Sequence, residues 1–170
     1  MPHHDARDIF VTGLKNAHAM ENQALAIMKP QADRIQNYPQ VEARLRDHIL
    51  ETEGQIERLD RILDDMGEDR SALKDTALSM GGAMAAIGHT FAPDEIVKNS
   101  FADFAFENYE IAAYKSLLCL AEEAGVRSAI DPLRQNLEEE QAMAEWLDNN
   151  IEAVTLQYAG LRGAGEEAKR

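Results

Sequence analysis

The sequence predicts an all-α protein that folds as an up-down bundle of four long helices. Helix-forming residues dominate the chain, and no segment shows the strict two-residue alternation that is typical of a β-strand. Apolar residues instead recur every three or four positions along four long segments, as they do in helices that bury one face. With 170 residues, the chain is long enough for one full core. We expect one domain over residues 1–160 and a flexible tail over residues 161–170.

Proline and glycine mark the ends of the first two helices. The first helix should begin at Asp5, a suitable N-cap, and continue until Pro30 ends or kinks it. Pro39 suits the first turn of the second helix, because a proline there loses no hydrogen bond. That helix should end at Met66, with Gly67 as its C-cap.

A long crossover is expected to join the second helix to the third. Residues 68–92 are rich in glycine and small side chains, and we expect one short extra helix over residues 71–87. Met80, Met84 and Ile87 in this crossover cannot all face one core. Together with a third helix that is apolar nearly all round, they indicate that the protein forms a twofold homodimer.

The third and fourth helices complete the bundle. The third should open at residues 93–95, where two acids favour the positive end of the helix dipole, and close at Gly125. The fourth should begin within residues 128–132 and run to about Ala159. Four long helices with one long connection between the second and third describe a bundle with a crossover.

Three of these helices carry a glutamate in the middle of their apolar stripe, namely Glu21, Glu107 and Glu140. A buried carboxylate costs several kcal/mol unless another group compensates it. One shared metal site would compensate all three. The alternative is that these glutamates lie at the margins of wide helix faces and reach solvent.

The two halves of the chain resemble each other around these acids. The segment around Glu21 resembles the segment around Glu107, and each is followed 32 residues later by another acid, Glu53 or Glu139. Each half therefore resembles one helical hairpin that carries acids at matched heights.

The sequence does not decide which acid of the second helix points inward. Its core line points Thr52 inward, with Glu51 and Glu53 on opposite sides. His48 and Gln55 lie on the same side as Glu51, where they could bind a metal or support its ligands. The same choice arises between neighbouring acids on the third and fourth helices. The candidate metal ligands are Glu21, His48, Glu51, Glu53, Glu107, Glu110, Glu139 and Glu140.

Composition excludes several other functions. The formal net charge of −14 argues against binding to nucleic acid or to an anionic membrane, since both require clustered Lys and Arg. The single Cys119 excludes an intrachain disulfide, a cysteine-based zinc site and a four-cysteine iron centre. Neither a secretory signal nor a bilayer-spanning segment is apparent, so we expect a cytoplasmic protein. An oxygen-rich site suits Fe, Mn or Mg.

Two segments of the chain closely resemble signatures of the bacterial YciE/YciF family. They are Leu50-Glu51-Thr52-Glu53-Gly54-Gln55-Ile56-Glu57-Arg58-Leu59 and Glu107-Asn108-Tyr109-Glu110-Ile111-Ala112-Ala113-Tyr114. The resemblance extends over about residues 5–155. It implies a rubrerythrin- and ferritin-like four-helix bundle, usually dimeric, linked to stress responses and to a di-iron ferroxidase-type centre. It also implies that the metal is held by Glu21, by Glu51 or Glu53, by Glu107 or Glu110, and by Glu139 or Glu140.

The chain departs from this family pattern at the histidines. Di-iron bundles usually pair a glutamate with a histidine three residues later on two helices, and no Glu-x-x-His occurs in this sequence. Relatives often have histidine where this chain has Gln55 and Asn108. The departure bears on the metal content of the site more than on the fold.

The preferred function is a carboxylate-bridged dinuclear Fe or Mn protein that oxidises Fe(II) with O₂ or peroxide. Tyr109 or Tyr114 would be a nearby hydrogen-bonding or radical-quenching group. One alternative is a metal-free or weakly metal-binding helical dimer that acts as a stress-related interaction module. Another is a peroxidase or manganese-catalase-like enzyme.

Overall fold

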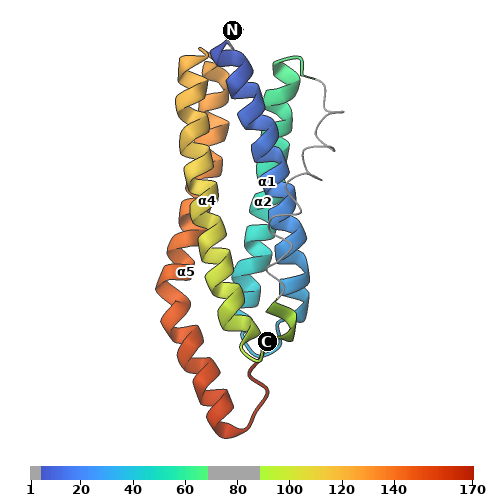
Figure 1. Ribbon diagram of the computed structural model, residues 1–170, viewed down its shortest axis with the longest axis vertical. Coiled ribbons are helices and arrows are strands. Elements are labelled where there is room, and N and C mark those ends of the chain that lie inside the picture. Colours follow the sequence, from blue (N-terminus) through green and yellow to red (C-terminus); the bar gives the residue numbers. More distant parts are fainter. Residues whose placement is uncertain (1–4, 69–88) are drawn as a thin grey trace.

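The computed structural model describes residues 5–68 and 89–170, which form a bundle of four long helices (Figure 1). These are α1 (Ala6–Arg34), α2 (Pro39–Asp65), α4 (Glu95–Glu123) and α5 (Ile130–Ala164). Two short 3₁₀ helices, η2 (His89–Phe91) and η3 (Arg127–Ala129), precede α4 and α5. The described part of the chain contains no strand, so the predicted all-α bundle is confirmed.

The order of the helices along the bundle confirms the predicted crossover. α1 runs away from the end marked N and α2 returns to it, whereas α4 starts at the opposite end and α5 runs back along α4 (Figure 1). α2 and α4 therefore point in the same direction. The short helix expected over residues 71–87 lies outside the described residues. So do Met80, Met84 and Ile87.

The glycines expected to end α2 and α4 do so. Gly67 and Gly125 have φ angles of 74° and 68°, in the left-handed region that glycine adopts without steric cost. We expected Pro30 to end or kink the first helix. It does not end the helix, because α1 continues to Arg34. Pro30 removes one backbone hydrogen bond. The neighbouring Met28 and Ala32 pack into an apolar cluster with α2 and α5, which keeps the last turn helical.

The C-terminal end of the chain also differs from its expected form. α5 continues past Ala159 to Ala164, so the first residues of the expected tail belong to the helix. The last residues turn back onto the bundle. There the Tyr38 hydroxyl donates to the Ala168 carbonyl at 2.6 Å, and the Ile96 N–H donates to the Lys169 carbonyl at 2.9 Å. Ala168 is buried, so an apolar contact as well as hydrogen bonds holds this segment.

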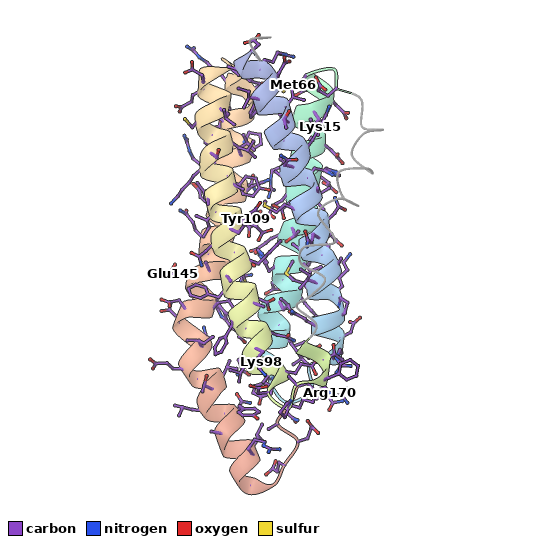
Figure 2. The ribbon with its side chains drawn as sticks, viewed as in Figure 1. Lys15, Met66, Lys98, Tyr109, Glu145 and Arg170 are labelled. Atoms are coloured by element: carbon purple, nitrogen blue, oxygen red, sulfur yellow. The ribbon has the colours of Figure 1, made fainter. Side chains whose placement is uncertain are left out.

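The core contains three apolar clusters, and a polar layer separates two of them. On α1, the cluster nearer the N-terminus ends at Met20 and the other begins at Ala24. Glu21 lies between them and is fully buried. The same division occurs on α5, where Asn136 and Glu140 are buried between the two clusters. The side chains of this layer meet inside the bundle. Tyr109, which lies between Glu107 and Glu110 in the sequence, is near the middle of the bundle (Figure 2). Among the described residues, no helix is both long and apolar enough to cross a bilayer.

Candidate metal centre

Five side chains that can bind metal meet in this polar layer. Glu21 comes from α1, His48 from α2, Glu107 and Glu110 from α4, and Glu140 from α5; each is at most 2% exposed. His48, Glu107 and Glu140 each offer one ligand atom, and these atoms all lie within 4.8 Å of one another. Glu21, Glu110 and Glu140 form a second such group. Glu140 belongs to both, so the two groups share one carboxylate.

The helix period explains why α4 supplies two acids. Glu107 and Glu110 are three residues apart and therefore lie on the same face. The sequence left open which of them points inward, and the structure buries both. On α5 only Glu140 points inward, while its neighbour Glu139 is partly exposed.

His48 is held so that one ring nitrogen faces the acids. Its Nδ1 lies 2.7 Å from Glu51 Oε2, and its Nε2 lies 3.3 Å from Glu107 Oε2 and 3.4 Å from Glu140 Oε2. Burial by itself would lower the pKa of His48, but Glu107, Glu140 and Glu51 together outweigh it and raise the pKa well above its usual value. A neutral ring that donates from Nδ1 to Glu51 would present the Nε2 lone pair to a metal.

Three of the four glutamates in this layer have raised pKa values. Burial is the main cause of the raised pKa values of Glu21, Glu107 and Glu110, and the neighbouring carboxylates raise them further. Burial acts on Glu140 in the same direction, but its interactions with His48 and Glu107 outweigh burial and lower its pKa. Glu140 is therefore the one carboxylate of this layer whose pKa is lowered, and it is also the shared one.

The polar atoms of this layer fit a pair of metal ions. Both carboxylate oxygens of Glu110 and Glu140, one oxygen each of Glu21 and Glu107, and His48 Nε2 are buried and lack a hydrogen-bond partner. Within the described residues, no Lys or Arg pairs with any of these four acids. Gln55 is also fully buried, and both polar atoms of its side chain are unpartnered. Carboxylate oxygens with one imidazole form a donor set that suits iron or manganese.

A chain of hydrogen bonds supports Glu21 from behind. The Tyr114 hydroxyl donates to Glu21 Oε1, and Asn136 Nδ2 donates to the Tyr114 oxygen at 3.0 Å. Arg58 in turn donates to Asn136 Oδ1. Of the two tyrosines expected as alternatives near the centre, Tyr114 makes this hydrogen bond, whereas Tyr109 is 56% exposed.

Three predicted ligands lie outside the buried group. Glu53 pairs with Lys29 of α1 at 2.8 Å, and Glu139 pairs with Arg58 of α2. Glu51 contacts His48 and supports a candidate ligand rather than reaching the centre itself. For Glu51 and Glu53 the physical reason is the rotation of α2, which points His48, Thr52 and Gln55 inward and leaves the flanking acids at the helix margins. Glu53 and Glu139 occupy matched heights in the two halves of the chain, but neither belongs to the buried group.

The two positions where relatives often have histidine, Gln55 and Asn108, differ in this structure, because Gln55 is buried and Asn108 is exposed. Asn108 is exposed, and its side chain donates to the Phe104 carbonyl at 2.7 Å. It therefore lies away from the centre. The imidazole comes instead from His48, three residues before Glu51, so its order along the helix is the reverse of the Glu-x-x-His motif.

Sequence reasoning missed two buried polar residues. Asn136 lies one turn before Glu140 and is fully buried, and Asp103 lies one turn before Glu107. Burial raises the pKa of Asp103 to about 7. In both cases the available signal was a polar residue four positions from a central glutamate, on the same helix face.

Comparison with known proteins identifies the family of this chain. The family model described as "Domain of unknown function (DUF892)" matches residues 5–160. Protein YciF of Escherichia coli (strain K12) is 32% identical over 145 residues, covering 79% of this chain and 83% of that protein. The chain belongs to the YciE/YciF family.

Two solved structures show how far the likeness to YciE/YciF proteins extends in three dimensions. The crystal structure of the E. coli stress protein YciF matches with a TM-score of 0.76 at 26% identity, over 87% of this chain and 95% of that one. A protein from Xanthomonas campestris pv. campestris matches with a TM-score of 0.75 at 30% identity, over 89% and 93% of the two chains. The bundle is therefore the fold of this family.

Proposed function

We propose that this YciE/YciF-family chain is a ferritin-like protein that holds two iron or manganese ions between its helices and oxidises Fe(II) with O₂ or peroxide. The observation that carries the proposal is the sharing of Glu140 by two groups of buried ligands. A shared carboxylate can bridge two ions, as in carboxylate-bridged bundles. His48 and Glu107 would complete the ligands of one ion, and Glu21 and Glu110 those of the other.

The residues of the centre provide what this oxidation requires. Two Fe(II) ions supply one electron each, and hydrogen peroxide takes up two electrons and two protons as its O–O bond breaks to give two water molecules. Burial raises the pKa values of Glu21, Glu107 and Glu110, so protons would compete with metal for these carboxylates. Tyr114 keeps Glu21 oriented through its hydroxyl.

The test is to load metal-free protein anaerobically with Fe(II), count the bound ions, and then follow oxidation after mixing with O₂ or peroxide. We expect up to two ions per chain and oxidation faster than in buffer. Glu140→Gln should lose most of both properties, because it removes the carboxylate that the two groups share. Glu53→Gln is the matched control, since Glu53 pairs with Lys29 outside the centre. Oxidation no faster than in buffer, despite binding, would reject the ferroxidase function.

A second candidate is a metal-free helical dimer that acts as a stress-related interaction module. The raised pKa of His48 favours it, because a protonated imidazole between Glu107 and Glu140 partly compensates their charge without metal. The E. coli relative is described as a stress protein. Failure to bind Fe(II) or Mn(II) in the loading experiment would favour this candidate. A peroxidase or manganese-catalase-like activity would instead appear as peroxide consumption by the Mn(II)-loaded protein.

Both candidates include a homodimer in the cytoplasm. Two large side chains of α4, Phe101 and Tyr109, are 55% and 56% exposed, and Tyr109 lies near the middle of the bundle (Figure 2). A second copy of the chain would cover them, as closed twofold interfaces do. Light scattering at micromolar concentration should give twice the chain mass. Phe101→Glu should shift the protein toward the monomer, and a wild-type monomer would contradict the proposal.

A further inference from the structure

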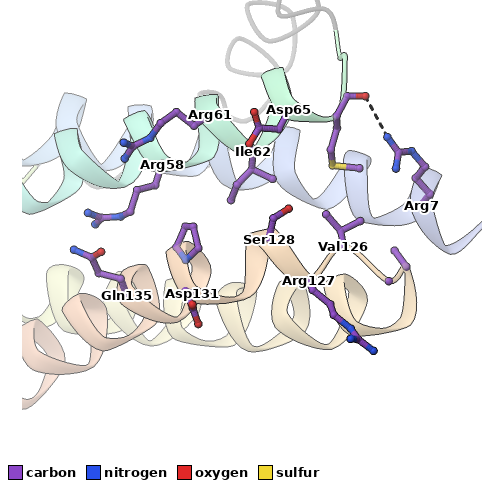
Figure 3. Close-up of a pocket in the computed structure, with 14 residues that line it drawn as sticks. Arg7, Arg58, Arg61, Ile62, Asp65, Val126, Arg127, Ser128, Asp131 and Gln135 are labelled. Carbon is purple, nitrogen blue, oxygen red and sulfur yellow. Dashed lines mark hydrogen bonds between the residues drawn. The ribbon is translucent and has the colours of Figure 1, made fainter.

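A hollow opens at the end of the bundle marked N, away from the carboxylate centre. It has a volume of about 690 Å³ and lies between the end of α2, the start of α1, and the turn from α4 into α5 (Figure 3). This volume is in the range of pockets that hold small organic molecules. No part of the proposed metal chemistry uses it.

Arginines dominate the charge of this hollow. Arg7, Arg58, Arg61 and Arg127 line it, together with only two acids, Asp65 and Asp131. This excess of positive charge is unexpected in a chain with a net charge of −14.

The arginines are incompletely paired. Arg7 donates only to the Met66 carbonyl, at 3.2 Å, and Arg58 donates to Asn136 and Glu139. Within the part of the chain that the structure describes, the side chains of Arg61 and Arg127 make neither a hydrogen bond nor an ion pair. In Figure 3, Arg58 faces Gln135 across the hollow, Arg61 lies beside Arg58 on α2, and the Arg127 side chain points away from the hollow. Arg61 and Arg127 are exposed, so each can turn toward a bound molecule.

The rest of the lining combines apolar and hydrogen-bonding groups. Ile62, Met66, Val126 and Pro132 give the hollow an apolar part. Ser128 adds a hydroxyl near the start of α5 (Figure 3). A guanidinium fork pairs with two oxygens of a phosphate at once, and an apolar surface suits a planar ring.

We propose that this hollow binds a small organic phosphate of nucleotide size, with its phosphates on the arginines and its ring on the apolar lining. A long polyanion such as nucleic acid fits poorly, because the rest of this acidic chain would repel it. The site does not depend on metal in the carboxylate centre. Its occupant can nevertheless influence that centre, because Arg58 begins the hydrogen-bond chain that ends at Glu21.

The test is calorimetric titration of the metal-free full-length protein with three probes in buffer free of divalent ions. ATP carries both parts of the proposed ligand, tripolyphosphate only the phosphates, and adenosine only the ring and sugar. ATP should bind more tightly than either of the others. Added KCl should weaken the binding of ATP but not of adenosine, because salt screens the arginine contacts.

Arg61→Gln and Arg127→Gln test the site directly. Neither side chain has a partner in the described structure, so both variants should keep the wild-type melting temperature. Each should weaken ATP binding about tenfold, the effect of losing one charge-assisted contact. Arg134→Gln is the matched control, because Arg134 is exposed on α5 but does not line the hollow. ATP affinity should not change in this variant.

Several results would overturn the proposal. They are the absence of ATP binding at millimolar concentration, binding that neither Arg61→Gln nor Arg127→Gln weakens, and adenosine binding as tight as that of ATP. Equal affinities for tripolyphosphate and ATP would overturn the part assigned to the ring. None of these results bears on iron oxidation, so the two proposals fail separately.

Discussion

Helix α4 buries acidic residues in two places, and the protein treats them in opposite ways. At the start of the helix, Glu95 is 3% exposed and accepts two hydrogen bonds from Arg34, at 2.8 Å and 2.9 Å. Lys169 of the C-terminal segment lies 3.6 Å from the same carboxylate. The bond from Arg34 lowers the pKa of Glu95 despite its burial. This carboxylate is ionised and is compensated by the chain itself.

In the middle of the same helix, Glu107 and Glu110 are equally buried but face no arginine or lysine among the described residues. Their pKa values are raised, mainly by burial. Burial of an acid is therefore not by itself a sign of a binding site. The sign is burial without a compensating cation, because such a group costs free energy until a cation is supplied from outside.

The largest expected effect concerns metal at the middle of α4. Excess Mn(II) should stabilise the wild-type protein by about 3 kcal/mol at a hundredfold excess over its Kd, because it binds only the folded state. Glu107→Gln should lose most of that gain, since it removes one ligand. Without metal it should melt higher than wild type, because glutamine avoids the free-energy cost of burying an ionisable carboxyl group, the same cost that raises the pKa of Glu107. Differential scanning calorimetry with and without Mn(II) measures both effects.

Glu53→Gln again serves as the control for that experiment, since it removes an acid of α2 that pairs at the surface. It should keep the wild-type rise in melting temperature. Identical melting curves for wild type and Glu107→Gln, with and without Mn(II), would show that the middle of α4 behaves as a solvated surface.

The matching change at the start of α4 should have the opposite sign. Glu95→Gln leaves Arg34 without its ionised partner and should destabilise the metal-free protein by about 1.5 kcal/mol. This is less than for a fully buried pair, because the Arg34 side chain is 31% exposed. The Mn(II)-induced stabilisation should be unchanged, since Glu95 does not belong to the centre. Urea unfolding curves give the difference, and a more stable variant would contradict the comparison.

The smallest expected effect is the pH dependence of the difference in unfolding free energy between wild type and Glu95→Gln. The folded-state pKa of Glu95 lies below its ordinary value of 4.5. Its ionised form therefore stabilises the fold above pH 4.5, and this contribution is lost as the pH falls through the folded-state pKa. The stability gap between wild type and Glu95→Gln should narrow as the pH is lowered below 4.5. A gap that widens toward low pH would show that Arg34 does not stabilise the charged carboxylate.

The sequence alone determined the class of fold and the acidic character of its middle. Local rules were sufficient for this, because apolar spacing predicts helices, and Gly67 and Gly125 mark their ends through backbone conformation. The central glutamates Glu21, Glu107 and Glu140 were predictable for the same reason, since each interrupts an apolar stripe.

Tertiary structure decided which polar groups meet and which are compensated. The rotation of α2 brings in His48 and leaves Glu51 and Glu53 at the margin, and a rotation of a fraction of a turn is not encoded in a period of three or four residues. Glu95 is compensated by Arg34, which lies 61 positions earlier in the chain. Such pairings depend on how helices pack in space. For that reason the sequence could nominate buried acids, and only the folded bundle could show which of them lack a partner.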